Sequence, residues 1–180
     1  PIAGSLNLRD AERADALVRD ANCPWVCVRP AALGDGAGKG KYLATEATGA
    51  SFAMLPYLRV LDLASNQVTG TTPAAICELS RLEIFEVRSN SMRGGIPSCL
   101  GNCTALTKID YSYNTLSGPI PATLCELPAL AYLELQTTSG LTGTIPECFG
   151  GPKQPDLVAL ALEDNQLTGP IPSSMCNATG

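Results

Sequence analysis

Carboxylates and cysteines are the residues that could do chemistry in this 180-residue chain, because the sequence contains no histidine. Catalytic triads, cysteine–histidine nucleophiles and imidazole-ligated metals are therefore excluded within the chain. Twelve basic residues stand against seventeen acidic ones, a formal net charge of −5. This balance does not attract a phosphate backbone, so we expect no nucleic-acid binding. No apolar run approaches the roughly 20 residues of a membrane span, so we expect no direct membrane insertion in this segment.

Four of the carboxylates recur every 24 residues. They are Asp62, Glu86, Asp110 and Glu134. If successive units stack as strands, these side chains stand about 5 Å apart in one column, a separation that retaining glycosidases use. The alternative is a solvated row of charges, with Arg88 and Lys108 offsetting part of the repulsion. An open sheet offers no pocket to raise the pKa of one carboxyl, so we expect neither an enzyme nor a cofactor.

The carboxylates belong to a longer repeat that begins at Leu58, and its units start at residues 58, 82, 106, 130 and 157. The fourth unit carries insertions. Nine positions agree among the units. In the first unit they are Leu58, Leu61, Leu63, Asn66, Val68, Gly70, Pro73, Ile76 and Leu79.

Each unit predicts one coil of a solenoid. The period of two in Leu61-x-Leu63 predicts a short strand with both leucines inside. Asparagines follow at the turn and are expected to form a ladder that satisfies backbone groups. They are Asn66, Asn90, Asn114 and Asn165. Glycine permits the second bend, the proline segment extends the far side, and a stretch such as Ala122–Leu127 makes one helical turn. Because no coil buries its leucines alone, we expect a right-handed α/β solenoid of five coils with a concave parallel β-sheet.

This pattern resembles the plant-type extracellular leucine-rich repeat, L-x-x-L-x-L-x-x-N-x-L-x-G-x-I-P-x-x-L-x-x-L. The match covers Leu58 to Met175, and the phrases at Leu141–Pro146 and Leu167–Pro172 look as they do in receptor ectodomains and polygalacturonase-inhibitor-like proteins. The resemblance implies secretion, disulfides, N-glycans and ligand binding on the sheet-lined face. The departures are Thr72 in place of isoleucine, Thr138 in place of asparagine, and the insertions in the fourth unit.

Residues 1–57 lack the period and are expected to cap the first coil. Asp10 is placed to cap a helix that runs through about Asn22. Cys23-Pro-Trp-Val-Cys27 resembles a shortened Cys-Trp-Cys element of plant repeat caps. We expect Trp25 to pack on the first coil and Cys23 to form a disulfide with Cys27 within the cap. The glycine-rich stretch 34–41 fails the phosphate-loop pattern and is expected to be a surface loop.

Two cysteine pairs each span about one coil, so their members are expected on neighbouring rungs of the convex side, within disulfide range. We predict the bonds Cys77–Cys99 and Cys125–Cys148. Cys103 replaces an interior leucine and is expected to be an inert buried thiol. The cysteines are spread along the stack, so no zinc site is expected.

Two sequons, at Asn102 and Asn177, occupy the same phase of their units and predict N-linked glycans on one edge. The concave face is left for a ligand. Its candidate binding residues are Asp62, Glu86, Arg88, Asp110, Tyr113, Tyr132 and Glu134. We therefore expect a secreted or cell-surface module that binds a protein, peptide or glycan. The alternative is a structural glycoprotein of a matrix, wall or filament that assembles through its uncapped end. The start at Pro1 is expected to reflect processing or a longer parent chain.

Overall fold

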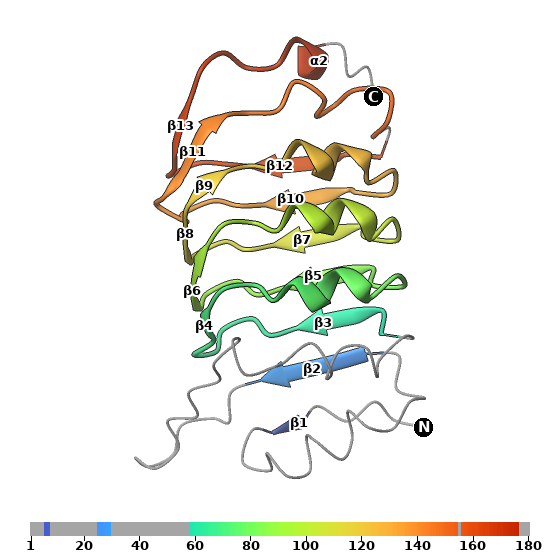
Figure 1. The fold of residues 1–180 in the computed structure, drawn as a ribbon, viewed down its shortest axis with the longest axis vertical. Helices are drawn as coiled ribbons and strands as arrows, with labels where there is room; N and C mark the ends of the chain where they lie inside the picture. Colours follow the sequence, from blue (N-terminus) through green and yellow to red (C-terminus); the bar gives the residue numbers. More distant parts are fainter. Residues whose placement is uncertain (1–5, 8–24, 30–57, 155, 177–180) are drawn as a thin grey trace.

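A computed structural model describes β1 (Leu6–Asn7), β2 (Trp25–Arg29) and residues 58–154 and 156–176. In these parts the chain winds into a stack of coils, with a strand of each coil on one side and short helices of several coils on the other (Figure 1). The predicted fold class is confirmed. The expected helix through Asn22, the glycine-rich loop, Cys23 and Asn177 lie outside the described residues.

A seven-stranded parallel sheet forms one side of the stack, in the order β1-β2-β3-β5-β7-β10-β12. The strands of the repeat units are β3 (Val60–Asp62), β5 (Ile84–Glu86), β7 (Lys108–Asp110), β10 (Tyr132–Glu134) and β12 (Ala159–Ala161). The central residues of the first four, Leu61, Phe85, Ile109 and Leu133, are buried and in register. The outward surface of β3, β5, β7, β10 and β12 is the predicted concave face, and we call it the sheet face.

Two smaller parallel sheets form the next side of the coils, where the sequence predicted only a bend and an extended segment. One contains β4 (Thr69–Gly70), β6 (Ser91–Gly94) and β8 (Thr115–Leu116). The other contains β9 (Gly118–Pro119), β11 (Leu141–Thr144) and β13 (Gln166–Thr168). Glycines at one fixed phase, such as Gly70 and Gly94, have φ of 87° and 80°, a conformation that side chains resist. This repeated turn keeps neighbouring rungs parallel for long enough to pair.

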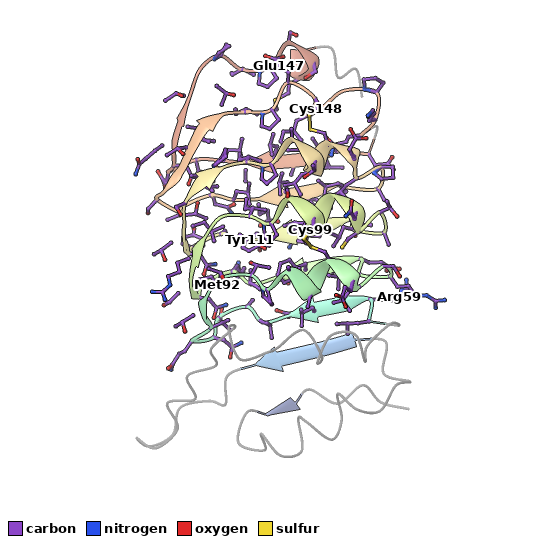
Figure 2. The ribbon with its side chains drawn as sticks, in the orientation of Figure 1. Arg59, Met92, Cys99, Tyr111, Glu147 and Cys148 are labelled. Atoms are coloured by element: carbon purple, nitrogen blue, oxygen red, sulfur yellow. A yellow bond between two sulfur atoms is a disulfide. The ribbon has the colours of Figure 1, made fainter. Side chains whose placement is uncertain are left out.

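The helical side carries helical turns after four of the repeat prolines, whereas the chain after Pro146 in the fourth unit makes turns without a helix. The four helical turns are the 3-10 helices η2 (Ala74–Glu78), η3 (Ser98–Asn102) and η4 (Ala122–Glu126), and the short α2 (Ser173–Cys176). The prolines that precede the three 3-10 helices have extended backbone, so each helix begins directly after its proline. The interior between the sheet and these turns is filled by apolar side chains, with Tyr111 among them (Figure 2).

The asparagine ladder is confirmed, and it links adjacent coils. The Oδ1 atom of Asn114 accepts a bond from the backbone N–H of Met92 at 2.9 Å, and its Nδ2 atom donates to Val87, Tyr111 and Ser112 carbonyls. Asn90 repeats the pattern one coil earlier. Thr138 interrupts the ladder, and its hydroxyl donates instead to the Oδ1 atom of Asn165 at 2.6 Å.

One departure from the repeat is explained by a partner two coils away. Tyr111 occupies an interior position and is fully buried, so its hydroxyl needs a hydrogen-bond partner. Thr72, where isoleucine is expected, lies with its Oγ1 atom 2.8 Å from the Tyr111 hydroxyl. The ring of Tyr111 also meets Phe85 edge to face, with centroids 5.3 Å apart. Burial raises the pKa of Tyr111 well above its ordinary range, so the hydroxyl stays protonated.

Both predicted convex-side disulfides are present, Cys77–Cys99 and Cys125–Cys148, with Cα atoms 5.7 and 5.8 Å apart. Figure 2 shows Cys99 and Cys148 on the helical side of the coils. Cys103 is a free, buried thiol, as predicted, and burial raises its pKa. The thiolate is the reactive form, so this sulfur is inert at neutral pH.

Candidate functional site

The strand register places the predicted carboxylates in one column on the sheet face. Asp62 pairs with Glu86, Glu86 with Asp110, and Asp110 with Glu134, on β3, β5, β7 and β10. Each lies one position after the buried central residue of its strand, so alternation turns it outward. Ala161 holds the next position, on β12, and ends the column.

Lys108 bridges this column. It lies two residues before Asp110 on β7, and therefore on the same side of the sheet. Its Nζ atom is 2.6 Å from the Oε1 atom of Glu86 and 3.4 Å from that of Glu134. Burial disfavours the charged form of Lys108, but its hydrogen bond to Glu86 and the negative charges of Glu86, Glu134 and Asp110 together outweigh burial, and its pKa is raised. Lys108 thus fills the space between two carboxylates that a reacting sugar would have to enter.

Asp110 is the one member of the column that is fully covered, with 1% of its surface exposed. Its Oδ1 atom accepts bonds from the backbone N–H and the hydroxyl of Ser112, at 2.9 and 2.6 Å. Its Oδ2 atom is buried and accepts no hydrogen bond from any described residue. Burial raises the pKa of Asp110, the charge of Glu134 adds to this rise, and together they exceed the opposing effects of the Ser112 hydrogen bonds and of Lys108.

These side chains surround an open pocket of about 510 Å³ on the sheet face. Its lining residues are Asp62, Ala64, Ser65, Glu86, Arg88, Lys108 and Asp110. The expectation that an open sheet has no pocket to raise a carboxyl pKa is therefore wrong for Asp110. The reason is tertiary, because Lys108 of the same strand pairs with Glu86 and Glu134 of the two flanking strands, and Asp110 between them is buried.

The predicted ligand-binding residues divide into two groups. Four of them line the pocket: Asp62, Glu86, Arg88 and Asp110. The other three lie outside the lining. Glu134 pairs with Lys108, which lines the pocket, and the side chains of Tyr113 and Tyr132 are 53% and 42% exposed. Tyr113 has φ of 55°, at a turn position where two other coils have serine. Lys108, Ser65 and Ser112 were not among the predicted binding residues, and the Asp-x-Ser spacing was the signal for Ser112.

The remaining candidates lie apart from the pocket. Asn102 ends η3 and is exposed, so its side chain is accessible to a glycan on the helical side. Among the described residues, no group of three or more histidine, cysteine or acidic side chains is arranged to hold a metal ion. The same residues contain no helix that is long and apolar enough to cross a membrane.

Comparison with known proteins agrees with the repeat. The Leucine Rich Repeat family model matches residues 57–79 and 105–127. No curated protein sequence matches the chain significantly. Among solved structures, the ectodomain of the receptor kinase GASSHO1/SCHENGEN3 from Arabidopsis thaliana, in complex with CASPARIAN STRIP INTEGRITY FACTOR 2, is similar with a TM-score of 0.75 and 25% identity. The similarity covers 92% of this chain and 18% of that one.

Two other solved structures show how widely this fold is used. The Arabidopsis receptor kinase HAESA, in complex with the peptide hormone IDA and the co-receptor SERK1, has a TM-score of 0.61 and 31% identity, over 68% of this chain and 20% of that one. A plant ice-binding protein has a TM-score of 0.60 and 34% identity, over 69% of this chain and 39% of that one. The chain thus spans less than half the length of each of these three proteins.

Proposed function

The repeats of this chain are leucine-rich repeats of the plant extracellular type, and we propose that the protein is a recognition module that binds a peptide or protein partner on its sheet face. The pocket around Asp110 is the observation that carries this proposal. The similarity to receptor ectodomains solved with bound partners supports it. The two disulfides support an extracellular location, because such bonds persist in oxidising compartments.

The composition of the sheet face favours binding over catalysis. Charges of both signs meet within hydrogen-bond distance at Lys108, and Tyr113 and Tyr132 expose large parts of their rings. Tyrosine and arginine are common anchors of protein interfaces. The strained backbone of Tyr113 adds to this, since a bulky side chain at positive φ is costly and tends to persist where it has a role. We expect N-linked glycans at Asn102, on an edge apart from the sheet face.

The proposal is tested by selecting peptides from a random display library against the whole chain. Affinities of the selected peptides are then measured by calorimetry for the chain and for the double variant Glu86→Gln, Glu134→Gln. Glutamine is used because reversal to lysine would place three cations together around Lys108. A matched control, Glu126→Gln with Glu147→Gln, removes the same charge from exposed positions on the helical side.

We expect the sheet-face variant to weaken binding by about tenfold or more, and the control variant to bind like the parent chain. Equal binding by all three proteins would refute the sheet face as the recognition surface. Sedimentation at increasing concentration examines the alternative, a structural subunit that assembles end to end. Assembly that is lost on deleting the residues after Leu167, but not in the sheet-face variant, would favour that alternative.

Ice binding is a second candidate, favoured by a separate feature. The strands of the two smaller sheets expose serine and threonine side chains on successive rungs, which are about 4.8 Å apart. These residues are Ser91, Thr115, Thr142, Thr144 and Thr168. Thr144 and Thr168 are register partners, whereas Thr115 pairs with Arg93, so the hydroxyl and methyl groups that would meet an ordered water lattice align on β11 and β13. A plant ice-binding protein is among the similar structures. Inhibition of ice recrystallisation that is lost in Thr142→Lys would support it, and its absence in the parent chain would exclude it.

A further inference from the structure

We propose that the partner of the sheet face is a polypeptide that places a lysine or arginine side chain in the pocket beside Asp110. This inference rests on the proposed recognition function and specifies its ligand. Three features of the pocket carry it: its charge balance, an unpaired carboxylate oxygen, and the rigid placement of that oxygen.

The charge balance of the site is negative. Among the described residues, Lys108 and Arg88 are the cations of the site, against the carboxylates of Glu86, Asp110 and Glu134, which leaves an excess of one negative charge. Lys108 directs its ammonium group to Glu86 and Glu134, on the two flanking strands. The charge of Asp110, on the strand between them, is compensated only at longer range.

The unpaired oxygen belongs to this same carboxylate. The Oδ2 atom of Asp110 is buried and accepts no bond from the part of the chain that is described, although Asp110 lines the pocket. A buried acceptor without a donor is a cost that a ligand can remove. Lysine and arginine side chains supply several N–H donors together with a positive charge, so one such group meets both needs. A carboxylate or phosphate ligand would add repulsion at this position.

The position of the oxygen is fixed before any ligand arrives. Two bonds from Ser112 hold the Oδ1 atom, so the carboxylate plane and its second oxygen keep one orientation. Lys108 and Glu86 cover the site and are partly exposed, which lets them move aside from the entrance. A prearranged acceptor under a movable ion pair is suited to admit a cationic side chain while excluding water.

Binding is then coupled to pH. Among the described residues, the charged groups around the pocket of Asp110 are Asp62 from β3, Glu86 and Arg88 from β5 and the turn after it, Lys108 from β7, and Glu134 from β10. A ligand cation beside Asp110 stabilises its ionised form and lowers the pKa that burial had raised. Affinity should therefore rise with pH through the range in which Asp110 titrates, and fall with added salt.

The test uses the isotope-labelled whole chain and three blocked pentapeptides of glycine with a central arginine, citrulline or glutamate. Citrulline matches the size of arginine but carries no charge. Nuclear magnetic resonance titration should show shifts at β3, β5 and β7 with the arginine peptide, and affinity about tenfold weaker with citrulline. Asp110→Asn keeps an Oδ1 acceptor for Ser112, so it should fold while losing about tenfold in arginine-peptide affinity. Glu126→Gln is the control that should bind like the parent.

Each other result overturns the inference. Equal binding of arginine and citrulline peptides, stronger binding of the glutamate peptide, or no shifts with any of them would show that the pocket does not select a cation. The peptides from display selection separate this failure from that of the proposed function. If they bind the sheet face but contain neither lysine nor arginine, recognition stands and only the cationic ligand is wrong.

Discussion

The substitution Asn114→Leu tests the physical basis of coil stacking. Asn114 is buried, with 4% of its surface exposed, and its amide makes four hydrogen bonds to backbone groups of two coils. Leucine fills the interior but neither accepts nor donates a hydrogen bond. The variant therefore removes the hydrogen bonds of the ladder while retaining an apolar side chain in the core.

The expected loss follows from which backbone groups remain without a partner. The carbonyl of Val87 keeps the amide of Asn90, and the carbonyl of Ser112 keeps the N–H of Ser89. The N–H of Met92 and the carbonyl of Tyr111 lose the bonds that Asn114 makes to them. Each buried group left unpaired costs about 1–3 kcal/mol, so two groups give roughly 2–6 kcal/mol. A change near 4 kcal/mol corresponds to a fall in melting temperature of roughly 8–16 °C.

The measurement is urea unfolding followed by circular dichroism, with Asn165→Leu as the matched control. Asn165 accepts its bond from the hydroxyl of Thr138 rather than from a backbone N–H, and it is only partly buried. Its replacement should therefore cost less than that of Asn114. A loss below about 1 kcal/mol for Asn114→Leu, or an equal loss for both variants, would show that the asparagine amides do not hold the coils together in this way.

Three further outcomes are expected. Because burial raises the pKa of Asp110, the folded chain binds the proton of this carboxyl more tightly than the unfolded chain does. The free energy of unfolding contributed by Asp110 should therefore fall as pH rises through the raised pKa. Unfolding measured across pH should show this fall for the parent chain and not for Asp110→Asn. Replacing Cys125 and Cys148 by serine should cost about 3 kcal/mol in urea unfolding, and peptide mapping without reductant should recover the two joined in the parent. Tyr111→Phe should cost about 1–2 kcal/mol because it leaves the buried hydroxyl of Thr72 unpaired, and adding Thr72→Val should recover most of it in a double-mutant cycle.

The features that could be predicted from the sequence are those that repeat with the coil. The spacing of Leu58, Leu61 and Leu63 was enough to predict the strand and the inward face, because alternation in a strand is a local property. The phase of the cysteines was enough to predict both convex-side disulfides, because equal phase on adjacent rungs implies proximity. The acidic column was predicted for the same reason.

Contacts that depend on the shape of individual side chains were decided by the tertiary structure. The sequence placed Lys108 beside the acidic column, but only the fold brings its ammonium group to Glu86 and Glu134 and covers Asp110. Thr72 and Tyr111 are 39 residues apart, in units that are not adjacent, so no repeat rule links them. Periodicity determines which residues share a column, whereas burial and pairing depend on which neighbouring side chains fill the space between columns.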